Sequence, residues 1–303
     1  SISLIGIYWL VLERNRDLSK TNIDWLTFIS IAFLPWLHIK YSITLIIFLF
    51  FMIFNLVSVN VNKKRLLNLF IPSIISLILL FLYNYYAFGN ITGPYDQWTK
   101  YGSNIHFSWK SITVFFGLLF DQEQGIFLQN PLNLLGLISI GLLYKKDKII
   151  CSIIALVSLS SIFINSIHPA WFGGYSLIGR FGWTGGIIFM LFAGYSLIWI
   201  GLINKKLLMI ISSASIAISM HVYKLFTIDS LHFYNLKNNP NSSRLYSSLG
   251  DYLPSWMEAD KVIFHMPNLI FILLSILLLY SGFIINKKIS NDYINTEKNP
   301  YQN

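Results

Sequence analysis

Apolar and polar residues are distributed along this chain in long blocks. Nine apolar runs are separated by polar gaps, and most runs approach the roughly 20 residues that a helix needs to cross about 30 Å of hydrocarbon. This pattern predicts an all-α fold, a polytopic transmembrane helical bundle of about nine spans with the first truncated, in a single domain over residues 1–303. The runs are Ser1–Leu12, Ile23–Leu37, Tyr41–Val59, Leu66–Phe88, Phe127–Tyr144, Ile149–Ile167, Gly182–Ile203, Leu207–Tyr223 and Pro267–Ile285.

Basic residues fall on alternate gaps, which predicts the orientation. Four gaps and the C-terminal tail hold 14 of the 22 basic residues but, with Asp24 at the start of the following run counted in, six of the 13 acidic ones. The positive-inside rule puts these gaps, and the C-terminus, in the cytoplasm. The long connections, about 89–126, 168–181 and 224–266, are then expected outside, with an interfacial helix at Trp109–Phe120 that is too short to span. The basic segments are 13–22, 61–65, 145–148, 204–206 and the tail from residue 286.

Composition agrees with a membrane protein. The chain is 55% hydrophobic and 12% charged, about half the charge of soluble domains, which is too little to cover a water-facing surface. Its net charge of +9 is spread in short clusters at the ends of runs, so the expected partner is membrane lipid and not nucleic acid. One cysteine excludes an internal disulfide, and no metal-ligand spacing is present. The abundance of Ile, Asn and Lys suggests a bacterial source, hence the inner (plasma) membrane.

The beginning of the chain bears on its completeness. Ser1 lies within a short apolar run that lacks the basic region and cleavage site of a signal peptide. We therefore expect these residues to be the C-terminal portion of a longer membrane protein.

The outer loop HPAWFGGYSLIGR is a candidate phosphate-binding site. It precedes a run that enters the membrane from outside, so the unpaired N–H groups of that helix point outwards. Paired glycines allow close backbone approach, and an arginine grips phosphate through two parallel hydrogen bonds. The alternative is a glycine turn whose arginine snorkels to the interface. The candidate residues are His168, Trp171, Gly173, Gly174 and Arg180.

A second outer segment, FDQEQGIFLQNP at Phe120–Pro131, carries two carboxylates. Asp121 and Glu123 lie two residues apart, where both can converge on a sugar hydroxyl, a cation or a substrate proton. The alternative is a solvated turn between an interfacial helix and a span. This alternative stays open on the residues alone.

A third segment, FLPWLHIKY at Phe33–Tyr41, forms the tip of a tight outer hairpin. It places His38 and Lys40 at the interface, where Lys40 can supply a second cation to a phosphate site. The alternative is a helix break and aromatic anchor at Pro35 and Trp36, with Lys40 snorkelling.

Taken in order, FLPWLHIKY, GLLFDQEQGIFLQNPLNLLG (Gly117–Gly136) and AWFGGYSLIGRFGW (Ala170–Trp183) resemble segments of GT-C class glycosyltransferases. The likeness covers about Ile23 to Ile203 and is greatest to the polyprenyl-phosphate-sugar-dependent enzymes related to protein mannosyltransferases and lipid A aminoarabinose transferases. It implies transfer of a sugar from a polyprenyl-phosphate donor to an acceptor on the outer face. Cations would surround the departing phosphate and a carboxylate would act as base, with no resident cofactor beyond a divalent cation.

The chain departs from this family in two places. The family's catalytic acid lies in a large first outer loop that has no counterpart here, so we expect it upstream of Ser1 and leave Asp121 as the one remote candidate. The family also follows its arginine with tyrosine and prolines, whereas Phe181 and Gly182 follow Arg180. The alternative function is a non-enzymatic membrane protein that binds or translocates lipid in the same outer groove.

Overall fold

The computed structural model describes residues 1–14, 21–58, 63–91, 93–94, 109–167, 180–228, 249, 252–256 and 265–298. Within these ranges the chain is helical and contains no strand, which confirms the all-α fold class. In the described residues, each of the nine predicted runs lies in one helix or in two consecutive helices. The helices are α1 (Ile2–Arg14), α2 (Thr21–Ala32), α3 (Leu34–Leu37), η1 (Ile39–Tyr41), α4 (Ser42–Ser58), α5 (Lys63–Phe88), α7 (Trp109–Phe120), α8 (Ile126–Gln129), α9 (Leu132–Lys146), α10 (Lys148–Ser166), α11 (Arg180–Ile203), α12 (Lys205–Ile228) and α13 (Met266–Lys298).

Five helical segments of the described chain are long and apolar enough to cross a membrane. An integral membrane protein is therefore supported, whereas a count of nine spans stays a prediction. The five segments are Ile39–Ser58, Arg65–Phe88, Lys148–Ser166, Arg180–Ile203 and Met266–Ile285.

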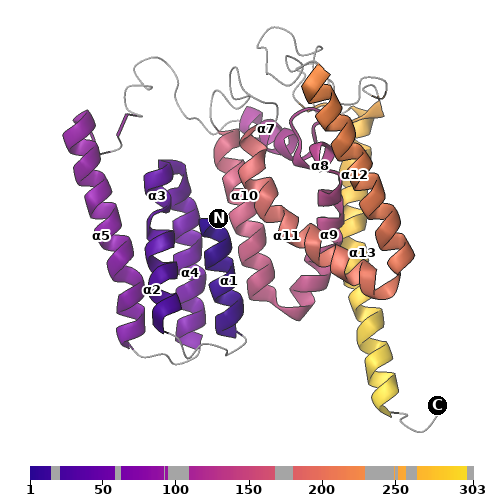
Figure 1. Cartoon of the computed structure of the whole chain (residues 1–303), viewed down its shortest axis with the longest axis horizontal. Coiled ribbons are helices and arrows are strands. Elements are labelled where there is room, and N and C mark those ends of the chain that lie inside the picture. The colour runs from indigo at the N-terminus through magenta and orange to yellow at the C-terminus, as the bar shows by residue number, and fades with distance from the viewer. Residues whose placement is uncertain are drawn as a thin grey trace.

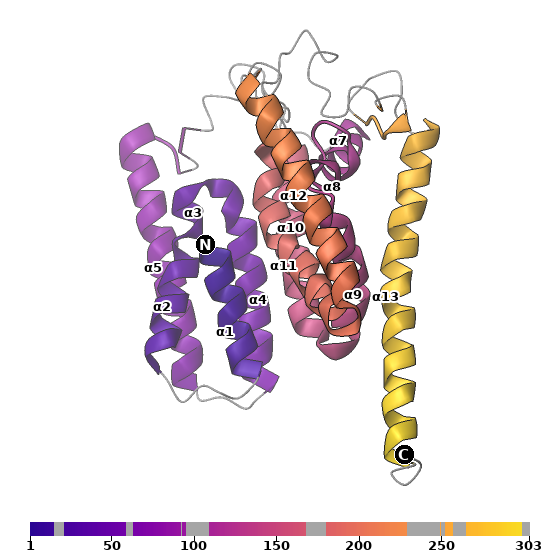
Figure 2. The same ribbon diagram turned by 45° about the vertical axis from the view of Figure 1, so that its right-hand side comes forward.

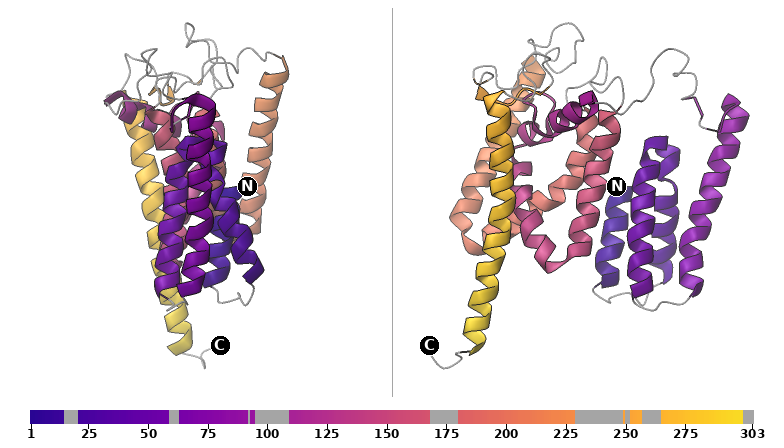
Figure 3. Two further views of the ribbon diagram at one scale, coloured as in Figure 1. Left: turned by 90° about the vertical axis from the view of Figure 1, so that its left-hand side faces the viewer. Right: turned by 180° about the vertical axis from the view of Figure 1, so that it is seen from behind.

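The helices form two groups that meet along α10. Helices α1 to α5 make up one group and α7 to α13 the other (Figures 1 and 2). Helix α10 packs against α1 and α4, and α9 packs against α10, α11 and α13. Helices α5 and α13 lie at opposite edges of the molecule (Figure 3), and both spans are largely exposed, as lipid-facing helices are.

The two ends of the bundle carry different side chains. We call the end that holds η1 and the first turn of α11 the Lys40 end. The opposite end, where α1 finishes and α2 and α5 begin, is the Arg65 end (Figure 1). Helix α7 has the bounds predicted for an interfacial helix and lies across the Lys40 end beside α8 (Figure 1).

Bends divide two of the predicted runs at the Lys40 end. Ile23–Leu37 forms α2 and α3, with a turn at Phe33 and Pro35 in the first turn of α3. Phe127–Tyr144 forms α8 and α9, which are joined at Pro131. Proline has no N–H and its ring clashes with the preceding turn, so neither helix continues through it.

Candidate functional site at the Lys40 end

A tight turn between α3 and α4 presents Lys40. His38 has an extended backbone, and its Nδ1 accepts a hydrogen bond from the Lys40 amide at 3.3 Å. The carbonyl of His38 accepts from the Tyr41 amide at 2.9 Å. His38 thus stabilises the turn of η1 that carries Lys40, and a substrate-binding role for His38 stays a prediction.

The Lys40 ammonium is held between two rings and an amide. Its Nζ lies 5.4 Å from the ring centroid of Tyr41 and 5.5 Å from that of Phe181, both within the range of a cation–π interaction. It donates a hydrogen bond to Oδ1 of Asn165 at 3.2 Å. Three helical segments that are far apart in the sequence therefore surround one cation.

Arg180, the first residue of α11, shares an aromatic partner with Lys40. Its Cζ lies 5.1 Å from the ring centroid of Phe181, and it is near enough to Lys40 for their charges to repel. Within the described residues neither Lys40 nor Arg180 forms an ion pair. The result is a pair of neighbouring cations that lack an acidic partner among the described residues, at the end of an apolar bundle.

The first turn of α11 is held in place by its neighbours. Asn165 donates from Nδ2 to the carbonyl of Phe181 at 2.6 Å. Trp183 donates from Nε1 to Oε1 of Gln129 at 3.0 Å, and Gln129 in turn donates to the carbonyl of Glu123 at 2.7 Å. The turn that carries Glu123 is thereby linked to the helix that carries Arg180.

Asp121 is buried and holds the chain together at this end. Its side chain is 2% exposed; Oδ1 accepts from the amides of Glu123 (2.8 Å) and Gln124 (3.0 Å), and Oδ2 accepts from the amide of Trp256 (2.8 Å). The Trp256 ring stacks on Phe116 at 5.4 Å. Asp121 therefore fastens the segment 252–256 to the turn between α7 and α8. A catalytic role for Asp121 stays a prediction.

Four of the predicted site residues lie in a segment that the structure does not describe. His168, Trp171, Gly173 and Gly174 lie outside the described residues. Among the described residues no group of three His, Cys, Asp or Glu side chains is arranged to hold a metal ion.

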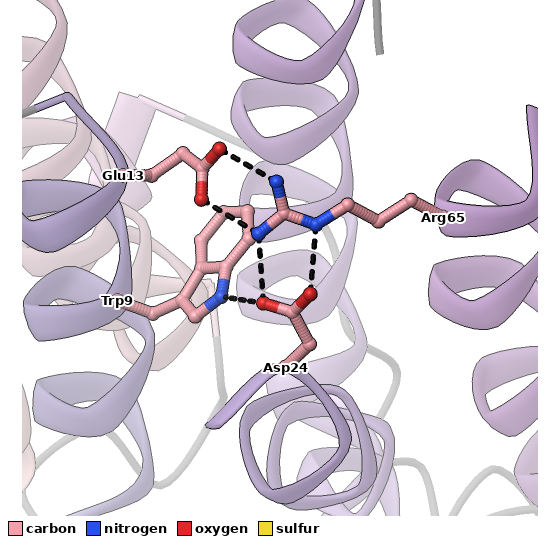
Figure 4. Close-up of polar contacts among 4 residues, drawn as sticks. All are labelled: Trp9, Glu13, Asp24 and Arg65. Carbon is pink, nitrogen blue, oxygen red and sulfur yellow. Dashed lines mark hydrogen bonds and ion pairs between the residues drawn. The ribbon is translucent and has the colours of Figure 1, made fainter. Parts of the chain in front are cut away.

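The Arg65 end contains a charge network that sequence reasoning missed. The guanidinium of Arg65 donates two hydrogen bonds to Asp24 (2.7 and 2.9 Å) and two to Glu13 (2.7 Å each). Trp9 donates from Nε1 to Asp24 at 2.8 Å, and its ring faces the guanidinium at 5.8 Å (Figure 4). The network joins α1, α2 and α5. The available signal was that Glu13 in one basic gap, Asp24 just after that gap and Arg65 in the next basic gap were all expected at the same end.

A second ion pair joins the two helix groups at this end. Nε of Arg14 donates to Oδ2 of Asp147. Oδ1 of Asp147 accepts from the amides of Ile149 and Ile150 at 3.0 and 3.1 Å, so the residue caps the start of α10. Both contacts are structural.

Comparisons of the chain with protein-family models, with curated proteins and with solved structures find no match.

Proposed function

We propose that this chain is part of a GT-C class membrane glycosyltransferase that binds a polyprenyl-phosphate sugar at the Lys40 end and transfers the sugar to an acceptor. The observation that carries the proposal is the convergence of Lys40 and Arg180 on the ring of Phe181. Two neighbouring cations without an acidic partner among the described residues favour an anionic ligand. Guanidinium fits a phosphate through parallel hydrogen bonds, and an ammonium adds a point charge.

The exposed face of α11 that continues from Arg180 suits a lipid ligand. Trp183, Ile187 and Met190 are exposed and follow Arg180 at spacings of three, seven and ten residues, which lie on one face of a helix. A polyprenyl chain can lie along this stripe while its phosphate reaches Arg180. A soluble anion would make no use of the apolar stripe, so the arrangement favours a lipid phosphate.

The proposed topology has about nine spans, with the Lys40 end outside, the Arg65 end and the C-terminus in the cytoplasm, and the bundle in a bacterial inner membrane. We expect a cysteine at Ser103 or Asn239 to react with an impermeant maleimide on intact cells, and one at the exposed Asn204 to react only after permeabilisation. Cys151 is buried and is first replaced by alanine. Reversed labelling would overturn the orientation and the outer position of the site.

The phosphate site is tested by affinity for a polyprenyl monophosphate in nanodiscs. We expect Arg180→Ala to lower this affinity by about ten- to a hundredfold, the value of a hydrogen bond between charged groups. Arg180→Lys keeps the charge but loses the two-pronged geometry, and we expect it not to restore binding. Lys40→Ala should lower the affinity similarly.

The matched control is Lys110→Ala, which removes an exposed cation from α7 at the same end. We expect it to leave the affinity unchanged. An equal loss of affinity in this variant would show that Arg180 and Lys40 act only through the general positive charge of this end. Unchanged binding by Arg180→Ala would show that the arginine is an interfacial anchor and not a phosphate ligand.

Transfer itself is measured in membranes as release of polyprenyl phosphate from the sugar-linked donor. Release that depends on Arg180 supports the transferase. Binding that depends on Arg180 without any release, measured on a chain that also includes the expected catalytic carboxylate, favours the non-enzymatic alternative, a protein that binds or translocates lipid.

A further inference from the structure

We propose that Asn165 is the positioning residue of the cation pair, and that its neutral amide keeps Lys40 available for an anionic ligand. The inference rests on the proposed phosphate site. Asn165 is 4% exposed and forms hydrogen bonds with Lys40 and with the carbonyl of Phe181, which follows Arg180, so it acts through the two cations.

The amide of Asn165 has one possible orientation. The Lys40 ammonium is only a donor, so the atom that faces it at 3.2 Å must be the carbonyl Oδ1. The backbone carbonyl of Phe181 is only an acceptor, so the atom at 2.6 Å must be the amino Nδ2. The site therefore requires a side chain that accepts on one side and donates on the other.

One side chain thereby positions both cations. Oδ1 holds Nζ of Lys40, which follows α3, and Nδ2 holds the carbonyl of the residue directly after Arg180. Helix α10, which carries Asn165, lies between these elements. The two hydrogen bonds of Asn165 consequently fix the distance between the Lys40 and Arg180 charges.

The neutrality of the amide matters as much as its shape. Within the described chain, Asn165 is the one hydrogen-bond acceptor of Lys40, which leaves two of the three ammonium N–H bonds for a ligand. A carboxylate at the same place would form an ion pair with Lys40 and cancel half of the site's charge. It would also turn a second acceptor towards the carbonyl of Phe181, which offers no proton.

The test compares Asn165→Asp and Asn165→Leu, with two probes in nanodiscs: a polyprenyl monophosphate and the uncharged polyprenol of equal chain length. We expect Asn165→Asp to weaken binding of the phosphate by about tenfold or more, the value of an interaction between charged groups, and to flatten its dependence on salt. We expect Asn165→Leu, which removes both hydrogen bonds but adds no charge, to weaken it by about two- to tenfold. Both variants should bind the polyprenol as the unmodified chain does.

A double-variant cycle separates positioning from a general structural role. If Asn165 acts through Lys40, Asn165→Asp should cost clearly less affinity when Lys40→Ala is already present, because only its effect on the Phe181 carbonyl beside Arg180 then remains. The inference would be overturned by equal losses of affinity for the phosphate and the polyprenol. It would also be overturned by an unchanged phosphate affinity in Asn165→Leu, which is a sufficient test even if Asn165→Asp does not fold. Unchanged phosphate binding in Lys40→Ala and Arg180→Ala would instead overturn the proposed phosphate site.

Discussion

Arg65→Ala is expected to lower the free energy of unfolding by about 3–5 kcal/mol, the cost of removing one partner from a buried ion pair. The substitution removes four hydrogen bonds at once and leaves Glu13 and Asp24 facing each other without a cation. Asp24 is 6% exposed, so water cannot replace the lost partner. Unfolding in a denaturing detergent, followed by the loss of helical circular dichroism, measures this decrease. Arg65→Lys should recover only part of it, because an ammonium cannot span both carboxylates.

The matched control is Arg14→Ala, which breaks the neighbouring ion pair at the same end. Arg14 and Asp147 have side chains that are 33% and 21% exposed, and Asp147 keeps its bonds to the start of α10. Solvent-screened pairs of this kind contribute about 0–1 kcal/mol. Similar losses in the two variants would show that the Arg65 network stabilises the fold no more than a surface pair does.

Gly282→Ala is expected to destabilise the fold by on the order of 3 kcal/mol, because α9 and α13 cross in backbone contact there. A Cβ on Gly282 would overlap the carbonyl oxygen of Ile138, and one on Gly141 would lie 2.7 Å from the amide nitrogen of Phe283. Neither obstacle is a flexible side chain, so the helices must separate. The same unfolding measurement applies.

Gly194 provides the control for this crossing. It also lies within a helix, α11, but nothing stands within 4 Å of a Cβ added to it. Gly194→Ala should therefore be neutral or stabilising by up to about 1 kcal/mol, since alanine is the better helix former. Equal effects of the two substitutions would contradict a close crossing of α9 and α13.

The helices themselves could be predicted from the sequence. Every apolar run is helical because backbone groups in an apolar surrounding must bond within their own segment, which a helix achieves locally. The helix Trp109–Phe120 was predicted with its observed bounds, and its interfacial position stays a prediction. The bends at Phe33 and Pro131 follow from prolines visible in the sequence. Hydropathy does not give the number of membrane crossings, because two of the apolar runs are each divided into two short helices. These helices are α2, α3, α8 and α9.

The candidate site was predicted only in part. The order of the apolar runs predicts that Lys40 and Arg180 lie on the same side of a membrane, because each run is taken as one crossing. It says nothing of which helices are neighbours, so it cannot bring these two cations to the ring of Phe181. Nor does it identify Asn165, whose role comes from two partners on other helices.

The charges at the other end show the same limit. Counting basic residues by gap treats Arg65 as one more positive charge at the membrane surface. In the folded chain this charge is paired with Glu13 of an earlier gap and with Asp24, which directly follows that gap. Local hydropathy thus determined the helices. Local charge predicts on which side of the membrane each connection lies. Only tertiary packing decided which charges are paired and which lack an acidic partner among the described residues, because pairing depends on distances between helices that no local pattern encodes.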